Sequence, residues 1–281
     1  MNHVLHTLFV LLATAALGAQ QQATTLWHLA DRAAVVVVAE ATAATDPTPE
    51  WHRIEFRADE VLNGSLGTRF SLLEPAGRCC GHALFSVVPG QSYLLFLERR
   101  GSLLHPFAGD RGVLTADQAT IEHVRSLLRL STDAQGVARE LSAALTAADS
   151  RIAHDAALAL PSLIELPQDG TSRASIRSAL RRHALDPTTA LPFLAAAVVR
   201  MEPEAAAAEL LPLYLETPAD DAARALQLAM ADVAVADLAT AMLSRTFAND
   251  SERVRAASLL ERRPDAANLP VLNRMLTSTL K

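Results

Sequence analysis

A succession of helix-length segments fills the chain from residue 117 onward, and it limits the possible folds more than any other feature. The first segment, 117–130, carries an i, i+3, i+6, i+7 stripe of apolar residues that starts at Ile121 and lies on one helix face. Further helices are predicted near 137–148, 151–164, 172–184, 188–201, 204–216, 219–231, 235–247, 251–262 and 267–279. Helices of this length with short joins are typical of an α-solenoid, whose units pack on their neighbours. A compact irregular bundle is the alternative.

Proline and short polar residues mark where these helices begin. The prolines at or beside predicted starts, where the first turn tolerates a missing N–H group, are Pro187, Pro203, Pro218 and Pro264. Asp149-Ser150 and Asn249-Asp250-Ser251 are predicted N-caps, because their side-chain oxygens can accept hydrogen bonds from free backbone N–H groups.

Two of these segments echo each other, DSRIAHDAAL at 149–158 and DSERVRAASL at 250–259. The second resembles the second helix of HEAT repeats, in which an Asp precedes a Val-Arg pair and small residues. In such repeats the Asp and the Arg link neighbouring units, and Ala lets helices approach closely. The resemblance implies structural roles for Asp250 and Arg255, within about four or five degenerate helix pairs.

The first half of the chain carries strand signals instead. Val35-Val36-Val37-Val38 is a β-branched run, and residues 51–57 alternate polar and apolar side chains. Asn63-Gly64 predicts a turn. A short helix at 25–32 and strands at 68–74, 92–98, 103–107 and 112–114 complete the set. Short strands punctuated by Gly, Pro and Asn predict a small barrel or sandwich.

Three motifs in this half occur in the order of a known family. They are LADRAAVVVVAEA at 29–41, Val61-Leu62-Asn63-Gly64, and a Cys80-Gly81 segment followed by GQSYLLF at 90–96. Together they resemble the netrin-like domain, the OB-type barrel shared by tissue inhibitors of metalloproteinases and complement C-terminal domains. Exported bacterial proteins of unknown function carry this version. The resemblance covers about a third of the chain and implies a small OB-like barrel, without implying an activity.

One departure from that family bears on function. In the metalloproteinase inhibitors an N-terminal Cys, exposed when the signal is removed, supplies an amine and a carbonyl to the protease metal. This chain has Gln20 at its expected new terminus and no Cys before Cys79. Protease inhibition by that mechanism is therefore not expected.

Residues 1–19, MNHVLHTLFVLLATAALGA, have the features of a secretory signal peptide. The apolar run from Leu8 to Leu17 is shorter than the roughly 20 residues of a membrane span, and it ends in small residues that predict cleavage after Gly18 or Ala19. The start lacks Lys and Arg, so an uncleaved membrane anchor is the alternative. Gln20 stands where a lipoprotein would need Cys. We expect a soluble periplasmic or secreted mature protein with no membrane association.

The cysteines, Cys79 and Cys80, are adjacent in a predicted loop, and His82 follows. Exported proteins normally pair their cysteines, but a bridge between neighbours closes a strained ring. Three interpretations remain: two thiols or a relic of a family disulfide, a vicinal disulfide, and a metal site. Zinc prefers wider spacing and four ligands, so Cys79, Cys80 and His82 are weak metal candidates.

Neither half of the chain has the positive charge of a nucleic-acid-binding surface. Residues 20–130 hold 10 Arg against 12 Asp and Glu, and residues 131–281 hold 15 Arg and Lys against 19 Asp and Glu. Aromatic residues make up only 4% of the chain, so base stacking on an OB-type barrel is disfavoured. We expect no nucleic-acid partner.

No catalytic constellation is predicted. His105 and Asp110 could orient each other for general-base catalysis, with Arg111 beside them, but no nucleophile elbow, His-Glu-x-x-His motif or phosphate loop accompanies them. The stretch 109–112 reads more simply as a turn. We therefore predict no catalytic residue and no cofactor.

The sequence as a whole predicts an α+β protein of two domains. The expected segments are a signal peptide at 1–19, a netrin-like or OB-type barrel at 23–116, a connecting helix and linker at 117–135, and HEAT-like repeats at 136–281. The expected function is that of a non-enzymatic exported module that binds or scaffolds a protein partner. The alternative is a metal- or redox-dependent enzyme or a protease inhibitor that uses the Cys79–His82 loop.

Overall fold

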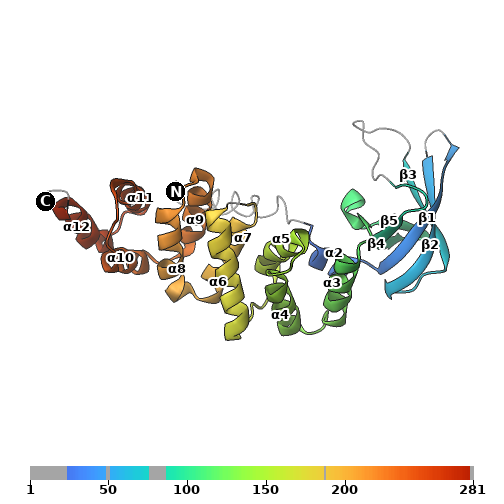
Figure 1. Ribbon diagram of the computed structural model, residues 1–281, viewed down its shortest axis with the longest axis horizontal. Coiled ribbons are helices and arrows are strands. Elements are labelled where there is room, and N and C mark those ends of the chain that lie inside the picture. Colours follow the sequence, from blue (N-terminus) through green and yellow to red (C-terminus); the bar gives the residue numbers. More distant parts are fainter. Residues whose placement is uncertain (1–23, 49–50, 76–86, 187, 279–281) are drawn as a thin grey trace, which may run out of the picture. The chain divides into compact units, whose positions relative to one another are not determined.

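The computed structural model describes residues 24–48, 51–75, 87–186 and 188–278. It is an α+β structure in which a curled antiparallel half-barrel sheet is followed by helices (Figure 1). Contacts within the chain divide it into two compact units, Met1–Thr132 and Asp133–Lys281. None of the helices in the described ranges combines the length and the apolar character needed to cross a membrane.

The sheet has six strands among the described residues. They are β1 (Val35–Thr48), β2 (Trp51–Asn63), β3 (Arg69–Pro75), β4 (Ser92–Arg100), β5 (Leu103–Pro106) and β6 (Val113–Thr115). The order is β3-β2-β1-β4-β5, with β6 also pairing with β4, and every pairing is antiparallel. The sheet curls far enough that β3 and β5, at opposite ends of this order, contact each other.

The two central strands, β1 and β4, are apolar on both faces because both faces are covered. Val35, Val37 and Leu95 lie on the face that also buries Ile54 and Phe56 of β2. Their neighbours on β1 and β4, including Val36, Leu94 and Phe96, lie on the opposite face in a second apolar cluster. Burial on both faces explains why these strands are continuous apolar runs, while β2 alternates buried and exposed residues.

Helices α2 (Leu26–Arg32) and α3 (Gln118–Arg129) cover this second face. Thr25 and Asp117 are their N-caps. Val124 of α3 is buried against the α2 cluster, and the neighbouring Arg125 donates to both carboxylate oxygens of Glu60 on β2, at 2.8 and 2.9 Å. The helix expected to be a connector is thus part of the core of the first unit.

Gly64 offers a test of the turn after β2. Gly64 and Gly90 both have positive φ, +80° and +84°, but a Cβ on Gly64 would overlap the carbonyl oxygen of Ala34, whereas nothing lies within 4 Å of a Cβ on Gly90. Both Gly→Ala changes should carry the left-handed penalty of about 1–2 kcal/mol. We expect Gly64→Ala to lower the free energy of unfolding in urea by at least about 1 kcal/mol more than Gly90→Ala. Equal losses would contradict the turn geometry.

The second unit is helical throughout its described part. Its helices are α4 (Ala134–Ala144), α5 (Ser150–Ala159), α6 (Gly170–Leu185), α7 (Leu191–Met201), α8 (Pro203–Glu216), α9 (Asp220–Ala229), α10 (Val235–Ser244), α11 (Asp250–Glu261) and α12 (Leu269–Ser278). Each predicted helix has a counterpart with shifted ends. The helix predicted at 151–164 ends early because Pro161 lies in a 3₁₀ turn, Leu160–Ser162.

Polar caps begin several of these helices, as the sequence predicted. The side chains of Asp149 and Asn249 accept hydrogen bonds from the first-turn N–H groups of α5 and α11. Asp133 and Asp169 do the same for α4 and α6. Pro203 is the first residue of α8, whereas Pro187 lies outside the described residues.

Alternate helices of this unit pack on each other. One series of contacts joins α4, α6, α8, α10 and α12, and a second joins α5, α7 and α9. Contacts between consecutive helices join α4 to α5 and run from α6 through α9, while α11 packs on α8. Figure 1 shows the helices following one another in chain order from green to red. Small buried residues such as Ala195, Ala197, Ala206 and Ala222 allow the helix backbones to approach closely.

Arginine side chains bind the carboxyl-terminal ends of earlier helices, and we call them the arginine clamps. They are Arg182 on Leu145 O (2.8 Å), Arg200 on Pro161 O and Leu163 O (2.5 and 3.0 Å), Arg255 on Tyr214 O and Leu215 O (3.1 and 3.3 Å), Arg263 on Met230 O and Val233 O (2.9 and 2.5 Å), and Arg274 on Leu243 O. The last carbonyl groups of a helix have no hydrogen-bond donor within the helix, and they carry partial negative charge. A guanidinium supplies both a donor and a positive charge.

Arg263 provides the test of the clamps. Arg263→Gln removes charged hydrogen bonds to two carbonyl groups and should lower the free energy of unfolding by about 2 kcal/mol. Arg263→Lys keeps the charge but loses the planar fork, so we expect an intermediate loss. The control is Arg151→Gln, an exposed arginine whose guanidinium makes no hydrogen bond or ion pair to any described residue, and this change should alter stability by less than about 0.5 kcal/mol. The clamp interpretation fails if urea denaturation gives Arg263→Gln and Arg151→Gln the same stability.

Candidate functional site

The candidate site of the alternative function cannot be placed. Cys79, Cys80 and His82 lie in 76–86, outside the described residues, and so does the expected signal peptide at 1–19. Among the residues that are described, no group of three or more His, Cys, Asp or Glu side chains is arranged to hold a metal ion.

The other histidine-carboxylate candidates lie on separate elements of the first unit. His105 is on β5, opposite Glu98 of β4, and Asp110 and Arg111 are in a 3₁₀ turn, Gly109–Gly112. The Arg111 guanidinium donates to the Thr24 hydroxyl at 3.2 Å. The stretch predicted to be a turn is therefore a single 3₁₀ turn.

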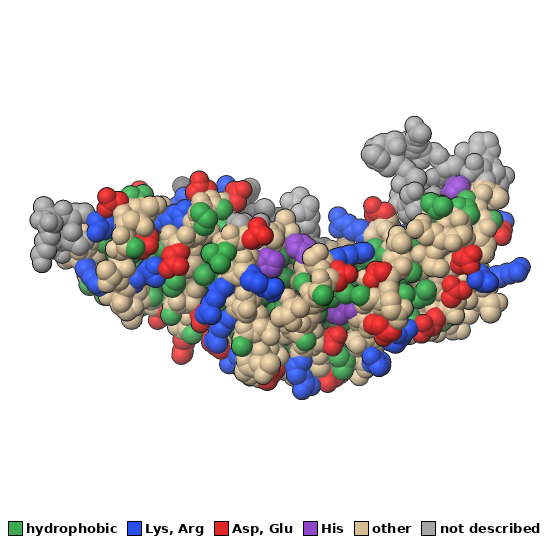
Figure 2. Space-filling model, in the orientation of Figure 1, with side chains coloured by type: hydrophobic (Ala, Val, Ile, Leu, Met, Phe, Trp, Pro, Cys, Tyr) green, Lys and Arg blue, Asp and Glu red, His purple; other side chains and the backbone are tan. Residues whose placement is uncertain are grey.

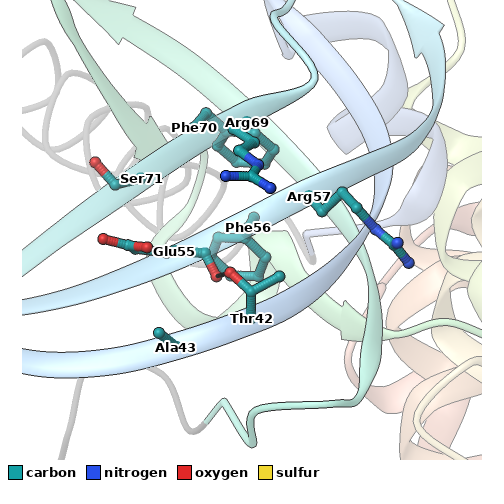
Figure 3. A pocket seen from close by; sticks show the side chains of 8 residues that line it. All are labelled: Thr42, Ala43, Glu55, Phe56, Arg57, Arg69, Phe70 and Ser71. Carbon is teal, nitrogen blue, oxygen red and sulfur yellow. Dashed lines mark hydrogen bonds between the residues drawn. The ribbon is translucent and has the colours of Figure 1, made fainter.

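A cavity of about 470 Å³ opens on β1, β2 and β3 of the first unit (Figure 3). Its apolar part is the stacked pair Phe56 and Phe70, with ring centroids 5.3 Å apart, and Tyr93 meets Phe56 edge-on. Phe56 is fully buried, so this stack belongs mainly to the core.

Polar groups surround the opening of this cavity. Arg57 pairs with Glu40 at 2.5 Å, and the Thr42 hydroxyl donates to the backbone oxygen of Glu55 at 3.1 Å. The guanidinium of Arg69 makes no hydrogen bond or ion pair to another described residue. Among the described residues, the lining contains hydroxyls, a carboxylate and two guanidiniums, with no histidine or cysteine to act as base or nucleophile.

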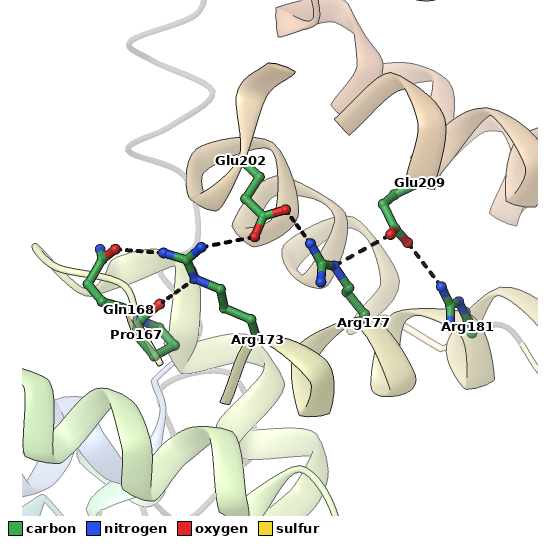
Figure 4. A network of polar contacts seen from close by, with 7 residues as sticks. All are labelled: Pro167, Gln168, Arg173, Arg177, Arg181, Glu202 and Glu209. Carbon is green, nitrogen blue, oxygen red and sulfur yellow. Dashed lines mark hydrogen bonds and ion pairs between the residues drawn. The ribbon is translucent and has the colours of Figure 1, made fainter. Parts of the chain in front are cut away.

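The helical unit contains a ladder of ion pairs between α6 and α8, which Figure 4 shows from close by. Arg173 and Arg177 both pair with Glu202, the first at 3.1 Å, and Arg177 and Arg181 both pair with Glu209, at 3.5 and 3.2 Å. Spacings of four residues place the arginines on one face of α6. Each carboxylate is shared by two guanidiniums, so the ladder ties the two helices together and every charged group in it has a partner.

The ladder predicts a stability difference between two nearby glutamates. Glu202→Gln removes the carboxylate that two half-buried arginines share, and it should lower the free energy of unfolding by about 1–2 kcal/mol. Glu204→Gln, an exposed residue in the first turn of the same helix, should cost only a few tenths of a kcal/mol. Thermal denaturation at low salt and at about 1 M salt measures both, and screening should shrink the Glu202 effect. An equal effect of both substitutions would contradict a stabilising ladder.

A histidine pair lies where α5, α6 and the loop before α7 meet. His183 Nδ1 is 2.7 Å from the Thr188 hydroxyl, and His154 Nε2 is 3.1 Å from the Thr189 hydroxyl. Burial lowers the pKa of His183, and the neighbouring Arg182 and His154 lower it further, so the ring favours its neutral form.

A second cavity, of about 480 Å³, lies between α8, α9 and α11, and we call it the arginine cavity. Its lining residues are Tyr214, Asp220, Ala223, Arg224, Gln227, Arg255 and Arg262. Arg255 is fixed by its clamp contacts and lies 3.6 Å from the carboxylate of Asp220. The Tyr214 hydroxyl donates to the backbone oxygen of Arg255 at 3.2 Å, and burial raises its pKa although Arg255 and Arg262 oppose the shift.

The sequence indicated a role for only one residue of this cavity, Arg255. The HEAT resemblance implied that Arg255 links neighbouring units, and the side chain does join α11 to the end of α8. Asp250 instead pairs with Arg253 of its own helix at 2.8 Å, and Asp220 provides the carboxylate near Arg255. One sequence pattern could have indicated the cavity. Arg224 and Gln227 are three residues apart, so they lie on one face of α9.

No protein-family model, curated protein sequence or solved structure matches this chain.

Proposed function

We propose that this chain is a non-enzymatic, exported module that binds a protein partner through its helical unit. The observation that carries the proposal is a set of large apolar side chains that the helical unit leaves in solvent. Ile164, Leu185, Val254 and Leu228 are 94, 73, 68 and 66% exposed. Covering these side chains with a partner would remove them from water, which favours association.

The packing of the helices supports HEAT-like repeats as the finer fold. Helices in such an array form two layers, and contacts that join alternate helices are the pattern that two layers require. The clamps connect residues 30–41 positions apart, the range of separations expected of two-helix repeats. Repeats of this kind offer an extended surface to a protein ligand.

The curl of the sheet supports an OB-type, netrin-like barrel as the finer fold of the first unit. The short helix before β1, the strand ending in Val61-Leu62-Asn63-Gly64 and the buried β4 occur in the order of that family. Contact between β3 and β5 is what nearly complete closure of such a barrel would bring about. A barrel beside the repeats would give the partner a second face to bind.

Charge supports a protein partner over a nucleic acid. On the face shown in Figure 2, Arg side chains are interspersed with Asp and Glu along the described part of the helical unit, with no continuous basic stripe. Mixed charge of this kind suits a protein surface and does not attract a phosphate backbone. Export follows from the signal-like residues 1–19 and sets the compartment in which the partner is sought.

The test uses the full chain, tagged at its carboxyl terminus and produced at its native level. Chemical crosslinking in intact cells, followed by purification from the extracytoplasmic fraction, should give a stoichiometric complex with one protein. Changing Ile164, Leu185, Leu228 and Val254 to Asp together should reduce its yield at least about tenfold, with little change in melting temperature, since all four side chains are exposed.

The control is Leu103→Asp, an exposed position on β5 of the first unit, which should leave the yield unchanged. The proposal is overturned if the wild-type chain gives no stoichiometric adduct. It is also overturned if the fourfold variant and the control retain the complex equally.

A further inference from the structure

The arginine cavity holds two guanidinium groups without partners. Arg224 on α9 and Arg262 at the end of α11 are exposed, and neither guanidinium makes a hydrogen bond or an ion pair with any described residue. The other arginines that bridge helices of this unit are engaged by carboxylates or by helix-end carbonyls. Two free cations therefore face one cavity.

The cavity is positive within an acidic unit. Arg224, Arg255 and Arg262 contribute three positive charges, and Asp220 contributes one negative charge. Residues 131–281 as a whole carry a net charge of −4. Tyr214 stays neutral because burial raises the pKa of its hydroxyl, so it adds no opposing charge. The local surplus of cations makes an anionic group the favoured occupant.

Gln227 adds a second, independent feature. Gln227 lines the cavity, and its buried Nε2 donor has no acceptor among the described residues, which costs about 1–3 kcal/mol in a folded protein. An oxygen anion that enters the cavity would give this donor an acceptor once the terminal amide rotates. The cavity thus offers two guanidinium forks and one amide donor to the same occupant.

The residues around the arginine cavity favour a peptide carboxylate over inorganic phosphate. Leu228 follows Arg224 by four residues, so the two side chains share one face of α9, and Leu228 is 66% exposed. It would contact an apolar side chain beside the anion, as a peptide supplies and inorganic phosphate does not. Asp220 would repel a dianion more strongly than a monoanion.

We propose that the arginine cavity binds the carboxylate side chain of an acidic segment of the partner protein, with an apolar residue of that segment beside it. This inference rests on the proposed function and deepens it by naming the recognised group. Arg224 and Arg262 bind the carboxylate, because a planar guanidinium fork matches its two oxygens. Arg255 remains in its clamp and supplies charge at the base of the cavity.

The test measures binding of two short peptides to the full chain by isothermal titration calorimetry at low salt. The probes are acetyl-Ala-Glu-Leu-Glu-Ala-amide and the same peptide with Gln in place of Glu, and inorganic phosphate is the third. We expect the Glu peptide to bind at least about tenfold more tightly than the Gln peptide and than phosphate, and to weaken as salt is raised.

Variants connect this binding to the cavity. Arg224→Gln combined with Arg262→Gln should weaken the Glu peptide at least about tenfold, and Arg262→Gln alone should weaken it less. Arg151→Gln changes the net charge by the same amount as Arg262→Gln at a distant exposed position, and it should bind like the wild-type chain. Both cavity side chains are exposed, so the melting temperature should stay within a few degrees of the wild type.

Three results overturn the inference: no binding of the Glu peptide up to about 10 mM, unchanged binding by the double variant, or phosphate binding as tightly as the peptide. Crosslinking of the double variant separates the two proposals. If the partner complex forms normally while the peptide does not bind, the interaction function stands and the cavity assignment fails. If the peptide binds in the cavity but the wild-type chain captures no partner, the proposed function fails and the carboxylate site remains.

Discussion

Guanidinium groups on the free carbonyls of helix ends are the interaction on which the helical unit depends. A helix leaves its last carbonyl groups without partners, and burying them between packed helices would be costly unless a donor reaches them. Arg182, Arg200, Arg255, Arg263 and Arg274 supply those donors from helices that follow later in the chain. Each clamp joins a helix to a later neighbour, so it satisfies the polar end and fixes the packing together. The Thr217 hydroxyl, which donates to Ala184 O at 2.9 Å, does the same for α6.

The first unit must bury both faces of its sheet, because its central strands are apolar on both sides. A strand such as β4 can be buried only if something covers each face of the sheet. Curling covers one face, where Phe56 and Leu95 pack in a single cluster. The helices α2 and α3 cover the other, where Val124 contacts the cluster around Leu94 and Phe96. Helix α3 is therefore as necessary to the sheet as its own strands, although it follows them in the chain.

Most interhelical arginines of the helical unit stabilise its packing, so arginines that have no such role are candidates for binding a partner. The ladder of Arg173, Arg177 and Arg181 shares two carboxylates, and the clamps occupy further guanidiniums. Arg224 and Arg262 have no such partner within the described chain, and they line the same cavity. In the proposed function, the carboxylate site would supply selectivity, and exposed apolar side chains such as Leu228, on the same face of α9 as Arg224, would supply buried area.

The sequence by itself determined the elements. Periodicity and β-branching located the strands and helices, and short polar side chains such as Asp149 and Asn249 marked helix starts, because each of these signals acts within a few residues. Helix ends differ from the predicted ends where a local turn, such as the 3₁₀ turn at Pro161, interrupts the helix. Only the tertiary structure decided which arginines are clamps and which remain free. Arg255 and Arg262 lie seven residues apart and line the same cavity, yet the Arg255 guanidinium is held by carbonyls of α8 and that of Arg262 has no partner among the described residues. Contacts that join residues 30–41 positions apart depend on how helices pack, and no local pattern encodes that distance.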